Sequence, residues 1–312
     1  MKFRTEIKSQ EAELKLDHTN GVVSIGSCFA DHIGERLSER NFIIHKNPFG
    51  ILFNPISIKK NILAALNQEV DQALFLSRDD RSYHYDFPAA FSSTREKDLA
   101  SQLASTQESF AQLWPSIDRL VITFGTAWVY RLIREKKIVA NCHKVPQAAF
   151  TKELLDLGFL QSEYQSFFEH LKKQNPNLEI MLTVSPVRHI KNGIHEDKLS
   201  KAILLLLSDY LEKEFDFVHY FPAYELLIDD LRDYRFYKTD MIHPTDQAVD
   251  YVFDHFMERY FSDKTKQISM LCEQLSKLEQ HVNRSATSNQ LDQLMERKEA
   301  LKREIERLKI KA

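Results

Sequence analysis

Two side chains that can act as nucleophiles, Ser27 and Cys28, stand next to each other early in the sequence. The apolar run at residues 22–25 predicts a buried strand that ends at Gly26, and a helical pattern follows over residues 29–40. The two side chains therefore lie in a turn between a strand and a helix. A helix N-terminus offers free backbone N–H groups and a positive dipole end, so it can hold an oxyanion and lower the pKa of a thiol.

A second pair of residues with suitable chemistry, Asp240 and His243, precedes a proline and a predicted helix over residues 245–260. A carboxylate at this spacing can orient an imidazole and stabilise its positive charge. The imidazole can then remove a proton from a nucleophile and later return it. These residues also have purely structural interpretations, because Ser27 can cap a helix, Cys28 can fill a core and His243 can pack or cap.

The elements that must position these residues alternate between strands and helices. Short apolar runs predict strands at residues 22–25, 41–45, 119–123, 178–184 and 215–220, and helical patterns cover residues 29–40, 55–66, 97–113, 162–173, 198–214 and 245–260. This order is typical of a three-layer α/β/α domain around a parallel, doubly wound sheet of about five strands. The carboxyl ends of such strands share one rim, at which ligands bind. We therefore expect residues 26–28, 47–50, 125–126 and 185–189 at this rim.

Some segments depart from this alternation. We expect an insert over residues 55–115, in which the aromatic segment 83–91 forms either an extended piece or a loop, and a hairpin over residues 128–139. Beyond residue 265, apolar side chains recur at intervals of three and four on both sides of a polar break at 283–289, which predicts an antiparallel helical hairpin or a coiled-coil arm. The predicted organisation is an α/β domain at 1–262 followed by a helical hairpin at 263–312.

The composition argues against several classes of protein. The formal charge of −3 gives no reason to expect nucleic acid or an anionic membrane as a partner, and no apolar run is long enough for a membrane span. The three scattered cysteines argue against a disulfide framework, and the N-terminus lacks the apolar core of a signal peptide, so we expect a soluble, cytoplasmic protein. Glycine-rich nucleotide-binding motifs are absent, and the adjacent Cys142 and His143 suit a zinc ion poorly. We expect neither a cofactor nor a metal.

The motif Gly-Ser-Cys-Phe-Ala at residues 26–30 is the signature that names the GSCFA family. Further motifs similar to that family follow in the same order at residues 47–50, 125–128, 141–144, 185–189 and 240–244. The chain therefore resembles the GSCFA family over roughly residues 1–262. That family is placed near the SGNH/GDSL hydrolases, which remove or transfer acyl groups, often on carbohydrates. The resemblance implies a flavodoxin-like sheet and a triad of a nucleophile, a histidine and an aspartate.

The resemblance also implies roles for particular residues. In SGNH enzymes the first motif is Gly-Asp-Ser, and in ungapped register its nucleophilic serine corresponds to Cys28. A shift of one residue would make Ser27 the nucleophile instead. His243 corresponds to the general base, which later acts as the acid, and Asp240 corresponds to the residue that holds its tautomer. The nucleophile therefore remains a choice between Cys28 and Ser27.

Other residues correspond to oxyanion-binding and substrate-binding positions. Gly50 and Gly125 fall where the second and third SGNH motifs supply hydrogen-bond donors. The third motif, usually Gly-x-Asn-Asp, reads Gly-Thr-Ala-Trp here, so its asparagine is missing and Thr126 or Asn141 is a candidate replacement. His143 lies on a segment that could be a loop over the site or an ordinary turn, and Arg188 could bind an anionic or polyol substrate.

These observations predict an acyl-ester hydrolase or acyltransferase of the SGNH type, for which an acylated carbohydrate or another small ester is a candidate substrate. A binding module that keeps the pocket without catalysis is the alternative, and the altered third motif favours it. A third alternative is a scaffold that acts through the hairpin at 263–312, which could join two copies of the chain in a homodimer.

Overall fold

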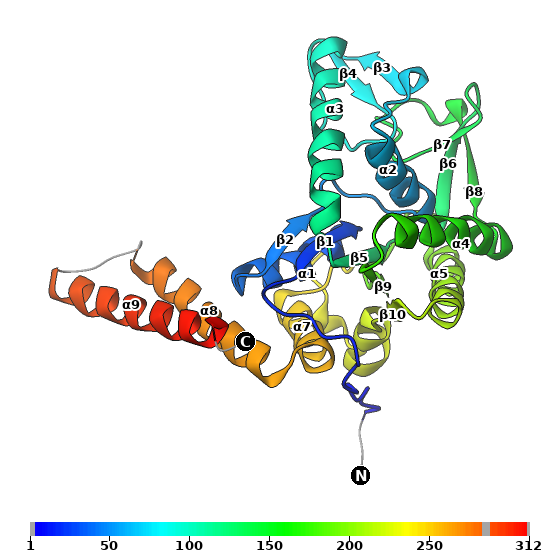
Figure 1. The fold of residues 1–312 in the computed structure, drawn as a ribbon. Helices are drawn as coiled ribbons and strands as arrows, with labels where there is room; N and C mark the ends of the chain where they lie inside the picture. Colours follow the sequence, from blue (N-terminus) through cyan, green and yellow to red (C-terminus); the bar gives the residue numbers. More distant parts are fainter. Residues whose placement is uncertain (1–3, 283–287, 311–312) are drawn as a thin grey trace.

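The computed structural model describes residues 4–282 and 288–310, and its centre is a five-stranded parallel sheet (Figure 1). The strands are β1 (Gly21–Gly26), β2 (Ile43–Lys46), β5 (Arg119–Phe124), β9 (Glu179–Val184) and β10 (Val218–Tyr220), in the spatial order β10-β9-β5-β1-β2. Every neighbouring pair is parallel. β1 and most of β5 and β9 are buried, as central parallel strands with both faces covered must be. The predicted parallel sheet is therefore confirmed.

Helices cover both faces of this sheet. One face packs against α1 (Cys28–Glu39) and α7 (Asp246–Tyr260), and the other against α4 (Leu157–Gln174) and α5 (Ile194–Glu214). The neighbouring residues Val22 and Val23 belong to the two opposite cores, because side chains alternate between the faces of a strand. The predicted three-layer α/β/α arrangement is confirmed.

An insert lies between β2 and β5 (Figure 1). It consists of α2 (Pro55–Asn67), the antiparallel strands β3 (Phe75–Arg78) and β4 (Arg81–His84), and α3 (Glu96–Leu113). α2 begins at residue 55 because Asn54 caps it, accepting the N–H of Ser57 at 2.8 Å. The aromatic segment 83–91 is partly extended and partly a loop, since β4 ends at His84.

A second, antiparallel sheet follows β5 along the chain. It contains β6 (Trp128–Leu132), β7 (Lys137–Val139) and β8 (Phe150–Leu154), in the order β7-β6-β8. The β6–β7 hairpin matches the predicted hairpin, whereas β8 was not predicted. The polar residues Thr151 to Glu153 give β8 no clear apolar alternation, and the strand forms because it pairs with β6 along its whole length.

Several predicted boundaries shift by a few residues. α4 begins at Leu157, directly after its N-cap Asp156, and α5 begins at Ile194, whereas β10 covers only the second half of the predicted strand. Short helical turns complete the chain: 3₁₀ turns at Gln72–Leu74, Trp114–Ser116, Gln147–Ala149, Ile190–Asn192 and Tyr234–Phe236, α6 (Ala223–Glu225), and a π-helical turn at Leu226–Leu231.

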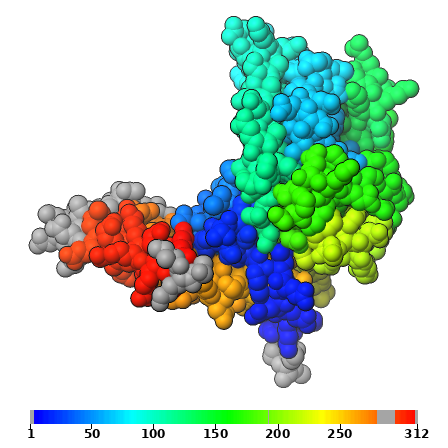
Figure 2. Space-filling model, viewed as in Figure 1, coloured from blue at the N-terminus to red at the C-terminus, as the bar shows by residue number. Residues whose placement is uncertain are grey.

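The C-terminal helices α8 (Asp263–Val282) and α9 (Ser288–Ile310) pack against each other and extend away from the α/β domain (Figures 1 and 2). Their shared apolar cluster includes Ile268, Cys272 and Ile305. An ion pair of 3.0 Å between Arg40 and Glu273 joins α8 to the domain. Most of the predicted polar break, at residues 283–287, lies outside the described residues. None of the helices within residues 4–282 and 288–310 could span a bilayer.

Candidate active site

Ser27 closes the turn between β1 and α1 by capping the helix. Its Oγ accepts the N–H of Phe29 at 3.3 Å, and its own N–H donates to the carbonyl oxygen of Thr123 at 3.0 Å. The residue is only 1% exposed. The hydroxyl of Ser27 therefore holds the turn, as the side chain of an N-cap residue usually does.

A second motif supports the same turn from the side. Asn47 accepts the N–H of Gly26 on Oδ1 at 2.8 Å and donates from Nδ2 to Asp31 at 2.7 Å. Gly26 has a φ angle of +144°, and a Cβ atom there would overlap the carbonyl oxygen of Thr123. The Gly-Ser-Cys-Phe-Ala motif and the Asn-Pro-Phe-Gly motif thus form one structural unit at the rim of the sheet.

Cys28 is the first residue of α1, and its side chain is half-buried. Burial raises the pKa of the thiol above its ordinary value, and the Asp31 carboxylate raises it further. The N–H groups of Cys28 and Phe29 and the amine of Lys201 lower the pKa, but burial outweighs them. The helix N-terminus therefore lowers the pKa of the thiol as expected, but the net shift is upward, and Cys28 carries its proton at neutral pH.

Asp240 and His243 form the pair that their spacing suggests. Asp240 Oδ2 lies 2.7 Å from His243 Nδ1, and Asp240 Oδ1 accepts the N–H groups of Ile242 at 2.9 Å and His243 at 3.0 Å. These backbone bonds first, and the bond to the imidazole second, lower the pKa of Asp240 to about 2. An ionised carboxylate at Nδ1 favours the tautomer that carries its proton there. The Nε2 atom of the half-exposed ring is then free to accept a proton.

A lysine that the sequence did not reveal lies beneath the rim. Lys201, from α5, is 1% exposed and donates from Nζ to the carbonyl oxygens of Gly125 and Ser185, both at 2.7 Å. These two carbonyls follow β5 and β9, so the lysine joins two strand ends. Burial lowers the pKa of Lys201 to about 8, while Asp197 and Cys28 act in the opposite direction. At neutral pH the amine is protonated and puts a positive charge near the Cys28 thiol.

His189 lies in the same neighbourhood, at the end of the segment that follows β9. Burial lowers its pKa to about 4, and the charges of Lys201 and His243 contribute to this lowering. Its N–H donates to Asp197 Oδ1 at 2.9 Å, and the centroid of its ring is 5.1 Å from that of Phe53. His189 is therefore neutral at pH 7, and its neighbours come from α5, from the loop at Phe53 and from the Asp240–His243 pair.

The glycine amides expected to bind an oxyanion are already engaged. The N–H of Gly50 donates to Asn47 O at 2.7 Å, and those of Gly125 and Thr126 donate to Phe53 O at 2.8 and 2.9 Å. In this conformation none of these three amides is free for a substrate. Within the described part of the chain, the N–H of Cys28 donates to no other residue, which makes it the available donor of this turn.

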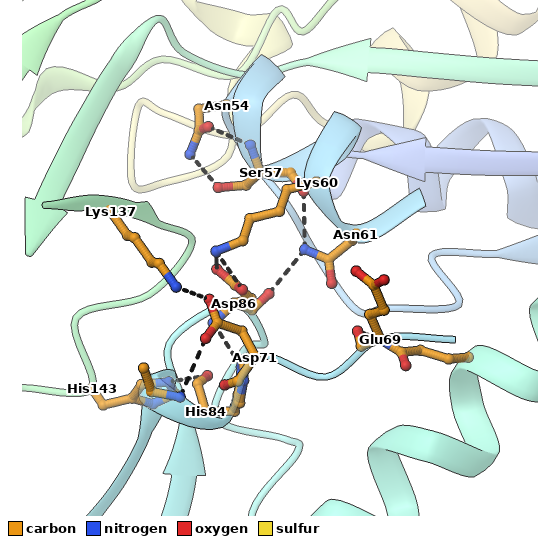
Figure 3. A network of polar contacts seen from close by, with 12 residues as sticks. Asn54, Ser57, Lys60, Asn61, Glu69, Asp71, His84, Asp86, Lys137 and His143 are labelled. Carbon is orange, nitrogen blue, oxygen red and sulfur yellow. Dashed lines mark hydrogen bonds and ion pairs between the residues drawn. The ribbon is translucent and has the colours of Figure 1, made fainter. Parts of the chain in front are cut away.

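Asn141 and His143 lie with the insert and not with the β1–α1 turn. Asn141 Oδ1 accepts the N–H of His143 at 2.8 Å, and His143 Nε2 is 2.9 Å from the carbonyl oxygen of His84. Figure 3 shows His143 beside His84, below α2. The ring of His143 also packs on Tyr83. Through these contacts, residues 141–143 connect the second sheet to the insert.

Arg188 supports the loop that carries the His–Asp pair. Its guanidinium stacks on the ring of Tyr237, with 4.0 Å to the centroid, and donates to Met241 O at 3.3 Å. Its backbone N–H donates to Ile242 O, also at 3.3 Å. The arginine therefore holds the segment that precedes His243, and its contacts are those of a positioning residue.

Comparison with protein families identifies the chain. The model of the GSCFA family matches residues 21–256. The protein belongs to the GSCFA family. The match includes the whole parallel sheet, the insert and the Asp240–His243 pair, and it ends before α8. Comparison with curated proteins found no match.

In this GSCFA protein a small cavity of about 150 Å³ opens beside the rim. Phe53, Thr126, Trp128 and His189 are among the residues that line it. Phe53 thus both holds the amides after β5 and forms a wall of the cavity.

Proposed function

We propose that this GSCFA protein is an acyl-ester hydrolase or acyltransferase of the SGNH type, with Cys28 as its nucleophile. One observation carries the proposal: a half-exposed thiol begins a helix at the rim that also holds a preassembled Asp240–His243 pair. Ser27 is the weaker nucleophile candidate, because it is buried and its Oγ caps α1.

Because the thiol of Cys28 is protonated, the reaction needs a base. His243 Nε2 removes the proton as Sγ attacks the acyl carbonyl, so that a C–S bond forms and the carbonyl oxygen becomes an oxyanion. The oxyanion collapses and the C–O bond breaks, and the leaving alcohol takes the proton from His243. Water or a sugar hydroxyl then cleaves the thioester by the same steps in reverse.

The surrounding charges suit this sequence of steps. Asp240 stays ionised throughout, since its pKa is about 2, and it stabilises the imidazolium that forms on His243. The N–H of Cys28 and the positive charge of Lys201 both favour the negative charge that develops on the oxyanion. Lys201 donates to two backbone carbonyls, so its role is electrostatic and structural. Its positive charge acts on the site from a distance, and its hydrogen bonds hold the ends of β5 and β9 together.

Intact-mass spectrometry after treatment with a short-chain activated ester tests the proposal. We expect one acyl adduct on the wild type and on Ser27→Ala, none at this site on Cys28→Ala, and much slower formation on His243→Ala. Cys142→Ala is the matched control, because Cys142 is also half-buried but lies outside the site. An adduct that requires Ser27 and not Cys28 would reassign the nucleophile.

A binding module without catalysis is the second candidate function. It is favoured by the raised thiol pKa and by the lack of a hydrogen bond between the His243 ring and Cys28 within the described residues. This function predicts that the folded wild type forms no adduct, while an ester analogue still raises its melting temperature. Catalytic hydrogen bonds often form only when substrate binds, so the first candidate remains the one that the geometry supports best.

The homodimer is a separate proposal that concerns the C-terminal helices. Met270 of α8 is 62% exposed and Met295 of α9 is 44% exposed, so each helix has an apolar side chain that a second copy of the chain could cover. Sedimentation of the full chain and of Met270→Glu tests this proposal. A dimer that dissociates in the variant supports it, and a monomeric wild type contradicts it.

A further inference from the structure

The insert contains a larger cavity, of about 600 Å³, that the proposed acyl-transfer site does not use. Its walls come from α2 and the loop after it, from α3, and from β4 and the loop after it, with one residue of α4. Figure 3 shows many of the polar side chains around it. The apolar part of the lining includes Ile56, Leu63, Val70 and Phe87.

Most of the charged side chains around this cavity occur in pairs, and the exception is Glu69, an exposed residue whose carboxylate forms no ion pair within the described residues. Lys60 contacts the buried Asp86 at 2.7 Å, and Lys59 contacts Glu163 at 3.0 Å. Asp71 pairs with a lysine of β7. A charged ligand would have to compete with these pairs or add an unpaired charge to a half-enclosed space. The charge of Glu69 is exposed to solvent, which screens it, so the enclosed part of the walls favours a neutral ligand.

The uncharged polar groups are held in fixed orientations. Asn61 donates from Nδ2 to Ser57 O at 2.9 Å and to Asp86 O at 3.1 Å. His84 Nδ1 accepts the N–H of Asp86 at 3.2 Å, which leaves its Nε2 to donate to Asp71 O at 3.0 Å. His84 is therefore a neutral imidazole of defined tautomer. A binding site whose polar groups are already ordered loses little entropy when a ligand arrives.

One polar atom in this wall has no partner. Gln107, from α3, is 2% exposed and donates from Nε2 to Glu69 O at 2.8 Å, which fixes the orientation of its amide. Within the described residues, Gln107 Oε1 accepts no hydrogen bond. A buried acceptor without a donor is unfavourable, and a hydroxyl group of a ligand would satisfy it.

We propose that this cavity binds a neutral polyol of about the size of a monosaccharide. Hydroxyl groups both donate and accept hydrogen bonds, so they suit the polar groups around Lys60. They can also satisfy Gln107 Oε1, which is fully enclosed in this conformation, once the Gln107 side chain turns toward the cavity. The C–H face of a sugar ring suits an apolar wall such as Phe87. The cavity belongs to the part of the chain that matches the GSCFA family, but the proposal does not depend on acyl transfer.

Saturation-transfer NMR and calorimetry on the full chain test this proposal. The probes are glucose, galactose and inositol, with glucose 6-phosphate and glucosamine as charged counterparts. We expect at least one neutral probe to bind, and glucose 6-phosphate and glucosamine to bind at least tenfold more weakly than that probe. Binding of no neutral probe to the folded protein would overturn the proposal, as would tighter binding of the phosphate or the amine.

Variants locate the binding. Gln107→Leu removes the unpaired acceptor and should weaken binding at least tenfold, whereas Gln112→Leu, on the exposed side of the same helix, should not change it. Leu63→Trp fills the cavity from a half-buried position and should abolish binding if Gln107→Leu does not fold. Cys28→Ala should bind as the wild type does. Unchanged affinity in the folded Gln107→Leu or Leu63→Trp variant would refute the assignment.

Discussion

Replacing Lys201 by methionine should remove a pH dependence from the stability of the protein. In the folded state the pKa of Lys201 is about 8, against an ordinary value of 10.5. Since one pKa unit corresponds to about 1.4 kcal/mol, this difference corresponds to about 3 kcal/mol. Below pH 8 the lysine is protonated in the folded and the unfolded chain, so the cost of burying its charge is fully present.

Between pH 8 and 10.5 the folded protein releases this proton while the unfolded chain keeps it. The unfolded state then binds more protons, so the free energy of unfolding rises with pH. Above pH 10.5 both states are neutral and the penalty has disappeared. Lys201 therefore destabilises the protein most at neutral pH and least in base.

Urea unfolding followed by circular dichroism at pH 7.5, 8.5, 9.5 and 10.5 measures this effect. The free energy of unfolding of the wild type minus that of Lys201→Met should increase by about 3 kcal/mol over this range. The control is Lys213→Met, an exposed lysine on the same helix, for which the difference should stay constant. Titration of tyrosines cancels in both differences, and all three proteins carry Cys28→Ala because the Cys28 thiol interacts with Lys201. A difference for Lys201→Met that does not change with pH would refute the reasoning.

Three other changes test the turn that carries the site. Gly26→Ala forces a Cβ onto Thr123 O and should lower the free energy of unfolding by at least about 4 kcal/mol. The control Gly193→Ala has a φ of +98° but no atom within 4 Å of the added Cβ, so it should cost only about 1–3 kcal/mol of backbone strain. Equal losses of the two variants in urea unfolding would contradict this prediction. Asn47→Ala leaves the N–H of Gly26 without its acceptor and should cost about 2 kcal/mol by the same assay, and a loss under about 0.5 kcal/mol would show that water replaces the side chain. The rate of alkylation of Cys28 by iodoacetamide can be followed by intact mass at a series of pH values. The pH midpoint of this rate should lie above that of an unfolded control, because the pKa of the Cys28 thiol is raised. A lower midpoint would mean that the helix N-terminus outweighs burial.

Much of the fold follows from local patterns in the chain. The runs that form β1, β5 and β9 are apolar because both faces of a central parallel strand are covered, and this makes them easy to recognise. The strand β8 was not predicted from the sequence, because its polar residues form a strand only by pairing with β6. Its stability depends on a partner that lies about twenty residues earlier, so no local pattern contains it.

Some features of the candidate site likewise follow from neighbouring residues in the sequence, and others follow from contacts between distant elements. The sequence by itself determined the Asp240–His243 pair and the cap at Ser27, because each involves residues within three positions of each other. Only the tertiary structure decided that burial raises the pKa of Cys28 and that Lys201 lies beneath the rim. The burial of a side chain and the electrostatic field around it depend on how distant elements pack together. The helix α5 lies near the β1–α1 turn only in the folded sheet. Local spacing can therefore supply the reacting groups, whereas their protonation states come from the folded protein around them.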